Sequence, residues 1–279
     1  MSFIDLGRIF RRRRDAPPTP APTPPPPPAA GITYTGNYAL WSDAERESTG
    51  YDATVILERT RDALLKVKRG EAVYERDSVL FEKPEYAYPM LTGLLRAALI
   101  RGGQLSVLDF GGSLGSTYFQ SRPFLHSLHH MEWSVVEQTA HVACGRGHFE
   151  DGHLRFYETV EECLACRQPT LLLLSGVLAY LSQPYSTLEG LLRHGIPHLV
   201  IDRTAFLTAD RDRLTVQTVP DSIYPASYPA WFFGETKFAA AIAAAGYTLV
   251  ADFPGADRLA PADEPAYFKG FIYEKKESQ

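Results

Sequence analysis

The segment Val107-Leu108-Asp109-Phe110-Gly111-Gly112-Ser113-Leu114-Gly115 carries the strongest fold signal in the 279-residue sequence. Apolar side chains flank the aspartate and lead into a run of glycines, which is the pattern of a buried strand that turns sharply into a helix. Glycines in such a turn let the backbone approach a ligand closely. The segment therefore predicts a strand, a turn and a helix of an α/β sheet, with a ligand at the turn.

Short apolar runs alternate with helical stretches after this turn. The predicted strands cover residues 105–110, 133–137, 154–157, 170–175 and 198–202. Strands that alternate with helices indicate a doubly wound, mostly parallel Rossmann-like sheet. An alanine-rich helix at 235–245 precedes two last apolar runs, 248–253 and 267–274, which we expect to form an antiparallel edge.

The chain before the turn reads as three further parts. Residues 1–15 form a basic amphipathic tail, residues 16–30 are a proline-rich linker, and residues 31–103 have the helical pattern of a cap before the core at 104–279. In the cap, Ser42 and Glu45 match a capping box, Asp52 matches a second helix start, and Gly70 a helix end. Another helix is predicted at 89–101.

Composition and charge exclude several classes of protein. The first 15 residues contain five arginines and two aspartates, which leaves about −8 for the rest of a chain whose net charge is −5. So acidic a body is a poor binder of nucleic acid. Three cysteines make no disulfide framework, and no run of 18 apolar residues exists, so we expect a cytoplasmic protein without a membrane span. Residues 1–14 fit either a solvated tail or a contact with a membrane or a protein.

Polar residues follow the ends of several predicted strands. Glu137 and Gln138 come about 28 residues after Asp109, where a carboxylate at the end of the next strand can accept both hydroxyls of a ribose. Ser175-Gly176 follows the fourth strand and Asp202-Arg203 the fifth. Because the carboxyl ends of parallel strands meet at one edge, these loops predict a single ligand crevice.

The turn also matches Gly-x-Ser-x-Gly, in which Ser113 would be the nucleophile of an α/β hydrolase. That enzyme needs an acid and then a histidine downstream, but the last histidine is His198. The Gly-x-Gly-x-x-Gly dinucleotide pattern fails at Ser113 and Ser116, and no Walker lysine follows. A relaxed turn of this kind suits S-adenosylmethionine, which has no pyrophosphate.

Several ordered segments resemble a family of bacterial S-adenosylmethionine-dependent methyltransferases associated with surface-polysaccharide loci. They are residues 73–81, 108–116, 135–138, 202–204 and 226–232, and the likeness extends over about 34–274. It implies a class I Rossmann-like methyltransferase in which Asp109, Gly111, Gly112, Ser113 and Gly115 form the cofactor loop and Glu137 binds the ribose. The general pattern has glycine where Ser113 stands.

Three other segments contain candidate binding residues. Cys163-x-x-Cys166, downstream of His141, Cys144 and His148, matches either a zinc site or helical packing, and we favour packing and expect no metal. The long segment 210–233 predicts a binding loop for the acceptor, with Tyr224, Tyr228 and Trp231. Glu75 and Arg76 lie between two predicted helices, where charged residues fit a solvated turn or a local salt bridge. The family resemblance favours a role in substrate binding, in which they close over the cofactor.

The expected chemistry is methyl transfer to a hydroxyl or carboxyl of a sugar or another small metabolite. Asp202 is the predicted base or acceptor-orienting carboxylate, with Arg203 and Tyr180 as neighbours. A structural ion pair between Asp202 and Arg203 is the alternative. A non-catalytic S-adenosylmethionine-binding scaffold also remains open, because Ser113 departs from the glycine pattern. The oligomeric state is open as well.

Overall fold

The computed structural model describes residues 31–50, 53–76, 79–83, 85–220 and 226–276. The chain divides into two units, Met1–Ala30 and the compact Gly31–Gln279. The predictions for the basic tail, the proline-rich linker, Asp52 and Tyr224 lie outside the described residues. No helix in the described ranges combines the length and the apolar composition needed to cross a membrane.

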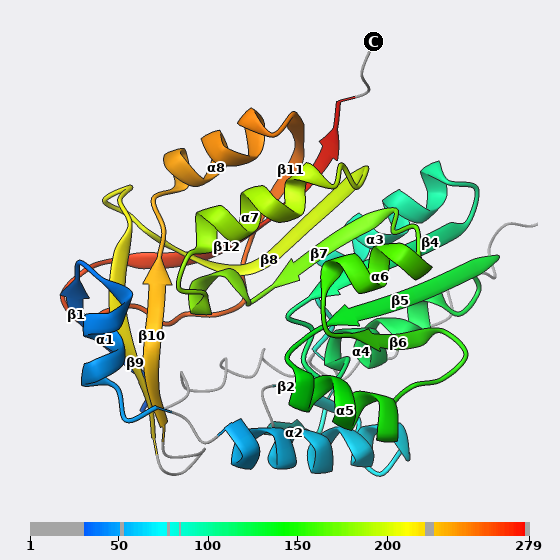
Figure 1. The fold of residues 1–279 in the computed structure, drawn as a ribbon, viewed down its shortest axis with the longest axis horizontal. Helices are drawn as coiled ribbons and strands as arrows, with labels where there is room; N and C mark the ends of the chain where they lie inside the picture. Colours follow the sequence, from blue (N-terminus) through cyan, green and yellow to red (C-terminus); the bar gives the residue numbers. More distant parts are fainter. Residues whose placement is uncertain (1–30, 51–52, 77–78, 84, 221–225, 277–279) are drawn as a thin grey trace, which may run out of the picture. The chain divides into compact units, whose positions relative to one another are not determined.

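A seven-stranded sheet in the order β11-β12-β8-β7-β4-β5-β6 forms the centre of the larger unit (Figure 1). Its parallel strands are β4 (Gln104–Phe110), β5 (His130–Val136), β6 (Leu154–Tyr157), β7 (Leu171–Ser175) and β8 (His198–Leu207). At one edge β12 (Ala266–Lys275) runs antiparallel to both β8 and β11 (Tyr247–Pro254). The predicted doubly wound sheet with an antiparallel C-terminal edge is confirmed.

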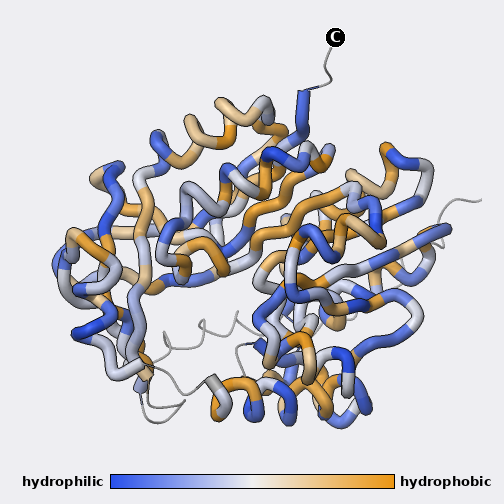
Figure 2. Tube along the Cα trace, in the orientation of Figure 1, coloured by the Kyte–Doolittle hydropathy of each residue, from blue (hydrophilic) through white to orange (hydrophobic). Residues whose placement is uncertain are grey.

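Helices cover both faces of this sheet. One layer contains α2 (Ala53–Lys68), α3 (Tyr88–Ile100), α4 (Ser116–Leu125) and α5 (Thr139–His148), and the other contains α6 (Val160–Cys166), α7 (Pro184–Arg193) and α8 (Glu235–Ala244). Successive side chains of a strand point to opposite faces of the sheet, so adjacent residues of β4 belong to different hydrophobic cores. Val107 packs against the first layer of helices and Leu108 against the second. The central strands are accordingly apolar on both faces. Figure 2 shows the resulting run of hydrophobic residues along β7.

The segment before β4 was predicted to be a helical cap, but it also contains strands. It contains β1 (Thr33–Tyr38), and the short hairpin of β2 (Tyr74–Arg76) and β3 (Val79–Phe81). Helix α1 (Trp41–Glu47) begins after Leu40 with no side-chain cap, so Ser42 lies inside the helix and the predicted capping box is wrong. Helix α3 packs directly on the sheet: a Cβ atom at Gly93 would lie 2.7 Å from Cγ2 of Val200.

A second, antiparallel sheet has the order β1-β9-β10 (Figure 1). Strands β9 (Arg213–Val219) and β10 (Ala226–Phe232) occupy most of the segment predicted as a loop. The predicted loop is therefore wrong, whereas its role in binding the acceptor stays a prediction. In β9, Leu214 and Val216 pack with Ala44 of α1, while the alternate residue Thr215 donates to the carbonyl of Ala230. This period-two pattern is the strand signal that nearby prolines and tyrosines obscured.

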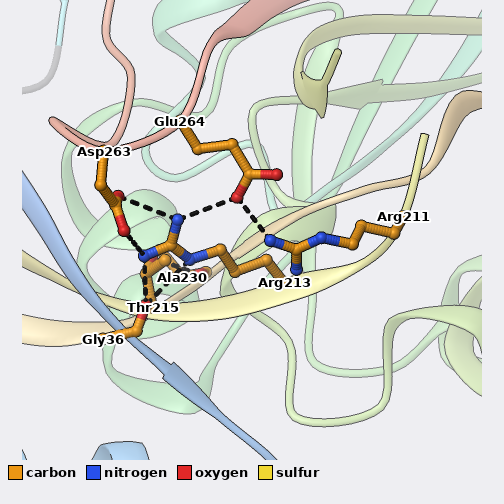
Figure 3. Close-up of polar contacts among 7 residues, drawn as sticks. All are labelled: Gly36, Arg211, Arg213, Thr215, Ala230, Asp263 and Glu264. Carbon is orange, nitrogen blue, oxygen red and sulfur yellow. Dashed lines mark hydrogen bonds and ion pairs between the residues drawn. The ribbon is translucent and has the colours of Figure 1, made fainter. Parts of the chain in front are cut away.

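Arg213 fastens the second sheet to the rest of the unit (Figure 3). Its buried guanidinium donates to the carbonyl of Gly36 on β1 at 2.7 and 2.9 Å. The same group bonds Asp263 at 3.0 Å and Glu264 at 2.9 Å, both in the β11–β12 connection. Arg211 also donates to Glu264, at 2.6 Å. Both arginines of this segment are therefore engaged in a structural ion cluster.

Candidate active site

A cavity of about 320 Å³ lies at the carboxyl edge of the parallel strands, within the size range of small-ligand sites. The turn after β4, the first turns of α4, the middle of β8, the β2–β3 hairpin and the β11–β12 turn all contribute to its wall. The sequence-predicted residues that line it are Glu75, Arg76, Asp109, Gly111, Gly112, Ser113, Ser175, Asp202 and Arg203. Residues predicted to bind the cofactor and residues predicted to bind or activate the acceptor thus line the same cavity.

The glycine-rich turn has little room for larger residues. Gly111 has φ of +73° and donates its N–H to the carbonyl of Val136 at 2.9 Å. A Cβ atom at Gly112 would lie 2.5 Å from the carboxyl group of Asp109, so only glycine fits there without displacement. Ser113 has φ of +53°, a left-handed conformation that is strained for a side-chain-bearing residue.

Asp109 is buried directly beneath this turn. The Nε1–H of Trp133 donates to its Oδ2 at 3.0 Å. Burial raises the pKa of Asp109 to about 7; the Trp133 hydrogen bond opposes the increase, and the nearby Glu137 adds to it. This carboxyl group therefore changes charge near neutral pH, and a bound cation would favour its ionised form.

The predicted ribose residues lie where β5 ends, outside the cavity lining described above. Glu137 is half-buried, and its Oε2 accepts the backbone N–H of Gln138 at 2.7 Å. Gln138 is exposed and forms the N-cap position of α5. Gly115 and Gly176 adopt φ of +90° and +66° and shape the loops beside the cavity.

Asp202 lies at a β-bulge within β8, not at the end of a strand as predicted. The register with β12 shifts between Lys269 and Phe271, so that Asp202 and Arg203 face a single residue, and Arg203 has φ of +53°. The bulge turns the buried carboxyl group of Asp202 into the cavity. Burial raises its pKa, while the backbone N–H of Arg203 at 2.8 Å and two arginine charges oppose that increase.

The guanidinium of Arg203 pairs with a residue that the sequence analysis missed. Its Nε donates to Oδ2 of Asp257 at 3.2 Å, across the cavity wall from the β11–β12 turn. Strand β11 is parallel to β8, because both are antiparallel to β12, and its carboxyl end must therefore reach the same edge. That topology was the available signal for Asp257. Ser116 and Glu85 also line the cavity and were not singled out.

Tyr180, Tyr228 and Trp231 are grouped elsewhere, on the second sheet and the 3₁₀ turn η1 (Leu178–Tyr180). The hydroxyl of Tyr180 donates to Gln217 at 3.1 Å, and Gln217 donates to the hydroxyl of Tyr228 at 3.1 Å. Trp231 Nε1 donates to the carbonyl of Leu181 at 3.1 Å. None of the three lines the cavity in the described part of the chain.

The described residues do not assemble the groups needed for the two alternatives, a hydrolase and a zinc site. The described residues that line the cavity include no histidine, so a hydrolase triad with Ser113 is not assembled among them. Within the described ranges no three His, Cys, Asp or Glu residues are grouped to hold a metal ion. Cys163 is buried and Cys166 is exposed on the short helix α6.

Known proteins resemble this chain in structure but not detectably in sequence. No family model and no curated protein sequence matches the chain. Among solved structures, a glycopeptide N-methyltransferase complexed with sinefungin is 13% identical, with a TM-score of 0.44 over 67% of this chain and 94% of its own. Human N-acetylserotonin methyltransferase in complex with SAM is 15% identical, with a TM-score of 0.47 over 79% and 56%. A pericyclic reaction enzyme is 12% identical, with a TM-score of 0.45 over 70% and 49%. The fold assignment stands on the strand order and pairing.

Proposed function

We propose that this chain is an S-adenosylmethionine-dependent methyltransferase that acts on a hydroxyl or carboxyl group of a sugar or another small metabolite. One observation carries the proposal. The glycine-rich turn after β4 and the bulge carboxylate of Asp202 line the same cavity, so a donor bound at the turn and an acceptor held by the carboxylate are brought together.

The charge of the cavity supports a cationic donor. Its described lining contains five carboxyl groups and only two guanidinium groups. S-adenosylmethionine carries a sulfonium and an ammonium group, and both are favoured by nearby carboxylates. We assign Asp109 and the turn to its methionine half and Glu137, at the end of β5, to the ribose hydroxyls.

Asp202 is the residue that we assign to proton removal. The bound cofactor supplies an electrophilic methyl group, and an acceptor hydroxyl must lose its proton as it is methylated. Burial raises the pKa of Asp202, which makes its ionised form a better base than an exposed aspartate. The bulge at Arg203 fixes the direction of this carboxyl group, and the Asp257–Arg203 pair holds the bulge in place.

The acceptor class follows from the loop after β7 and from the family resemblance. Ser175-Gly176-Val177-Leu178 lacks the Asp/Asn-Pro-Pro-Tyr type of sequence that cradles amino groups of bases and amides, so methylation of a nucleobase nitrogen is disfavoured. The resemblance to methyltransferases of surface-polysaccharide loci favours a sugar hydroxyl or carboxyl.

The test is methyl transfer from isotopically labelled S-adenosylmethionine to a panel of sugars, uronic acids and hydroxy acids. We expect label in one acceptor class, and a loss of at least 100-fold in turnover for Asp202→Asn with unchanged affinity for S-adenosylhomocysteine. Glu189→Ala, an exposed change on α7, is the control. Tight cofactor binding with no transfer to any acceptor would instead favour the scaffold alternative.

A further inference from the structure

The β2–β3 hairpin brings a carboxyl group to the cavity from outside the central sheet. Glu75 on β2 is only 2% exposed and lines the cavity wall. Its Oε2 accepts a hydrogen bond from the hydroxyl of Ser116 at 2.6 Å. Ser116 is the first residue of α4 and lies three positions after Ser113 in the glycine-rich turn. Glu75 is thus anchored to the donor side of the cavity.

The hairpin is braced in a way that fixes this position. The rings of Tyr74 and Phe81 stack at 5.3 Å across its two strands. The guanidinium of Arg76 lies 5.3 Å from the centre of the Phe81 ring and pairs with Glu85 at 3.6 Å. Side chains on both sides of Glu75 are therefore held by contacts within or beside the hairpin, and its carboxyl group has little freedom to leave the cavity.

Some of the charged side chains that line the cavity form ion pairs with each other, and other carboxyl groups lie apart from these pairs. The two arginines each pair with a carboxylate, Arg76 with Glu85 and Arg203 with Asp257. Of the other lining carboxyl groups, Asp202 lies at the β8 bulge, whereas Glu75 and Asp109 lie at the turn that begins α4. A cationic group bound at this turn would lie close to both carboxyl groups and would be stabilised by them in their ionised forms.

We propose that Glu75 binds the α-ammonium group of the methionine half of the cofactor. This inference rests on the proposed function, because it names a ligand-binding residue of the same site. Asp109 lies beneath the turn and Glu75 lies on the hairpin, so the two carboxylates approach the methionine half from different elements. The hairpin is then part of the cofactor site and contributes to its specificity for an amino-acid-bearing ligand.

The test measures calorimetric affinities of the full-length chain for S-adenosylhomocysteine and for its analogue without the α-amino group. For the wild type we expect the analogue to bind at least tenfold more weakly. For Glu75→Gln we expect S-adenosylhomocysteine to lose at least tenfold in affinity while the analogue is nearly unchanged. Glu189→Gln, an exposed carboxylate on α7 that does not line the cavity, is the control and should preserve the tenfold difference between the two ligands.

The outcomes distinguish this inference from the proposed function. Equal losses for both ligands in Glu75→Gln, or no loss for either, would overturn the role of Glu75 while leaving the cofactor assignment intact. Failure of the wild type to bind S-adenosylhomocysteine at all would overturn the proposed function itself. Ser116→Ala gives a second test, since loss of the anchoring hydroxyl should weaken S-adenosylhomocysteine several-fold more than the analogue.

Discussion

The indole Nε1–H of Trp133 donates a 3.0 Å hydrogen bond to Oδ2 of Asp109, beneath the glycine-rich turn. The pair joins the middle of β5 to β4, and burial raises the pKa of Asp109 to about 7. The central claim is that this carboxyl group, with the turn above it, forms the floor of a cofactor site. A group that titrates near neutral pH gives that claim a measurable signature.

Affinity for S-adenosylmethionine should rise with pH. A cationic ligand favours the ionised form of Asp109, so binding below pH 7 must first remove a proton. We expect affinity to increase several-fold between pH 6 and pH 8, with proton release near pH 7. Calorimetry in buffers of different ionisation enthalpy measures that release, and Asp109→Asn should abolish both effects. A pH-independent affinity in the wild type would contradict this role.

The same shift predicts how the stability of the ligand-free protein depends on pH. The folded-state pKa of Asp109 lies above its ordinary value, so its contribution to stability is complete below about pH 4 and is lost as pH rises towards 7. Asp109→Asn should therefore be more stable than the wild type at pH 8 by roughly 1 to 3 kcal/mol. Urea unfolding at pH 8 and pH 5 measures the difference, which should shrink at the lower pH.

Gly112→Ala should damage the site because the new Cβ would meet the Asp109 carboxyl group at 2.5 Å. We expect at least a tenfold loss of affinity for S-adenosylhomocysteine in calorimetry and a destabilisation of about 1 to 3 kcal/mol. Gly147→Ala is the matched control, because nothing lies within 4 Å of its Cβ position on α5. That change should leave affinity intact and stabilise the helix by up to about 1 kcal/mol. Wild-type affinity in Gly112→Ala would show that the turn does not approach the cofactor.

Ser113→Gly distinguishes cofactor binding from hydrolysis. Glycine adopts φ of +53° without strain, so the substitution removes backbone strain from the folded state. It also makes the unfolded chain more flexible, which favours unfolding, and the two effects on stability should nearly cancel. We expect stability within about 1 kcal/mol of the wild type and affinity for S-adenosylhomocysteine within threefold. Esterase assays with nitrophenyl esters complete the test: activity in the wild type that disappears in Ser113→Gly would support the hydrolase.

Arg213→Leu should destabilise the protein by about 2 to 4 kcal/mol, because it leaves the Gly36 carbonyl without its donor and removes the buried cation from the mostly buried Glu264. Arg211 pairs with the same glutamate, but its side chain is 46% exposed. Arg211→Leu should therefore cost less than about 1 kcal/mol. Urea unfolding of the two variants measures both values, and equal losses would show that the cluster does not depend on the buried guanidinium.

The sequence predicted the central sheet well because its strands are fully buried. Runs such as residues 171–174 are apolar on both faces, and a buried parallel strand has no other pattern. The glycine-rich turn was equally predictable, because the strand, the aspartate and the glycines that define it lie within nine consecutive residues. That Asp109, Asp202 and Arg203 line one crevice was predicted from strand order, but the position of Asp202 and Arg203 within β8 was not.

The second sheet could not be predicted in the same way because β1 pairs with a strand that is distant in sequence, and because prolines and tyrosines obscured the pattern of the consecutive strands β9 and β10. Tyr34 on β1 faces Gln217 on β9, and no local pattern around either residue specifies that partner. The β8 bulge depends likewise on the register with β12, which no local pattern specifies. For this reason Tyr180, Tyr228 and Trp231 were grouped with the cavity by their chemistry, although the structure places them outside its lining.

Calorimetric titration of the full-length chain with S-adenosylhomocysteine, beside Glu137→Ala, tests the central claim most directly. We predict micromolar binding, about −8 kcal/mol, that Glu137→Ala weakens by at least tenfold, about 1.4 kcal/mol, because the ribose loses its carboxylate. The exposed change Glu189→Ala should have no effect. Absence of binding, or equal affinity in the wild type and Glu137→Ala, would contradict the assignment of this edge of the sheet as a cofactor site.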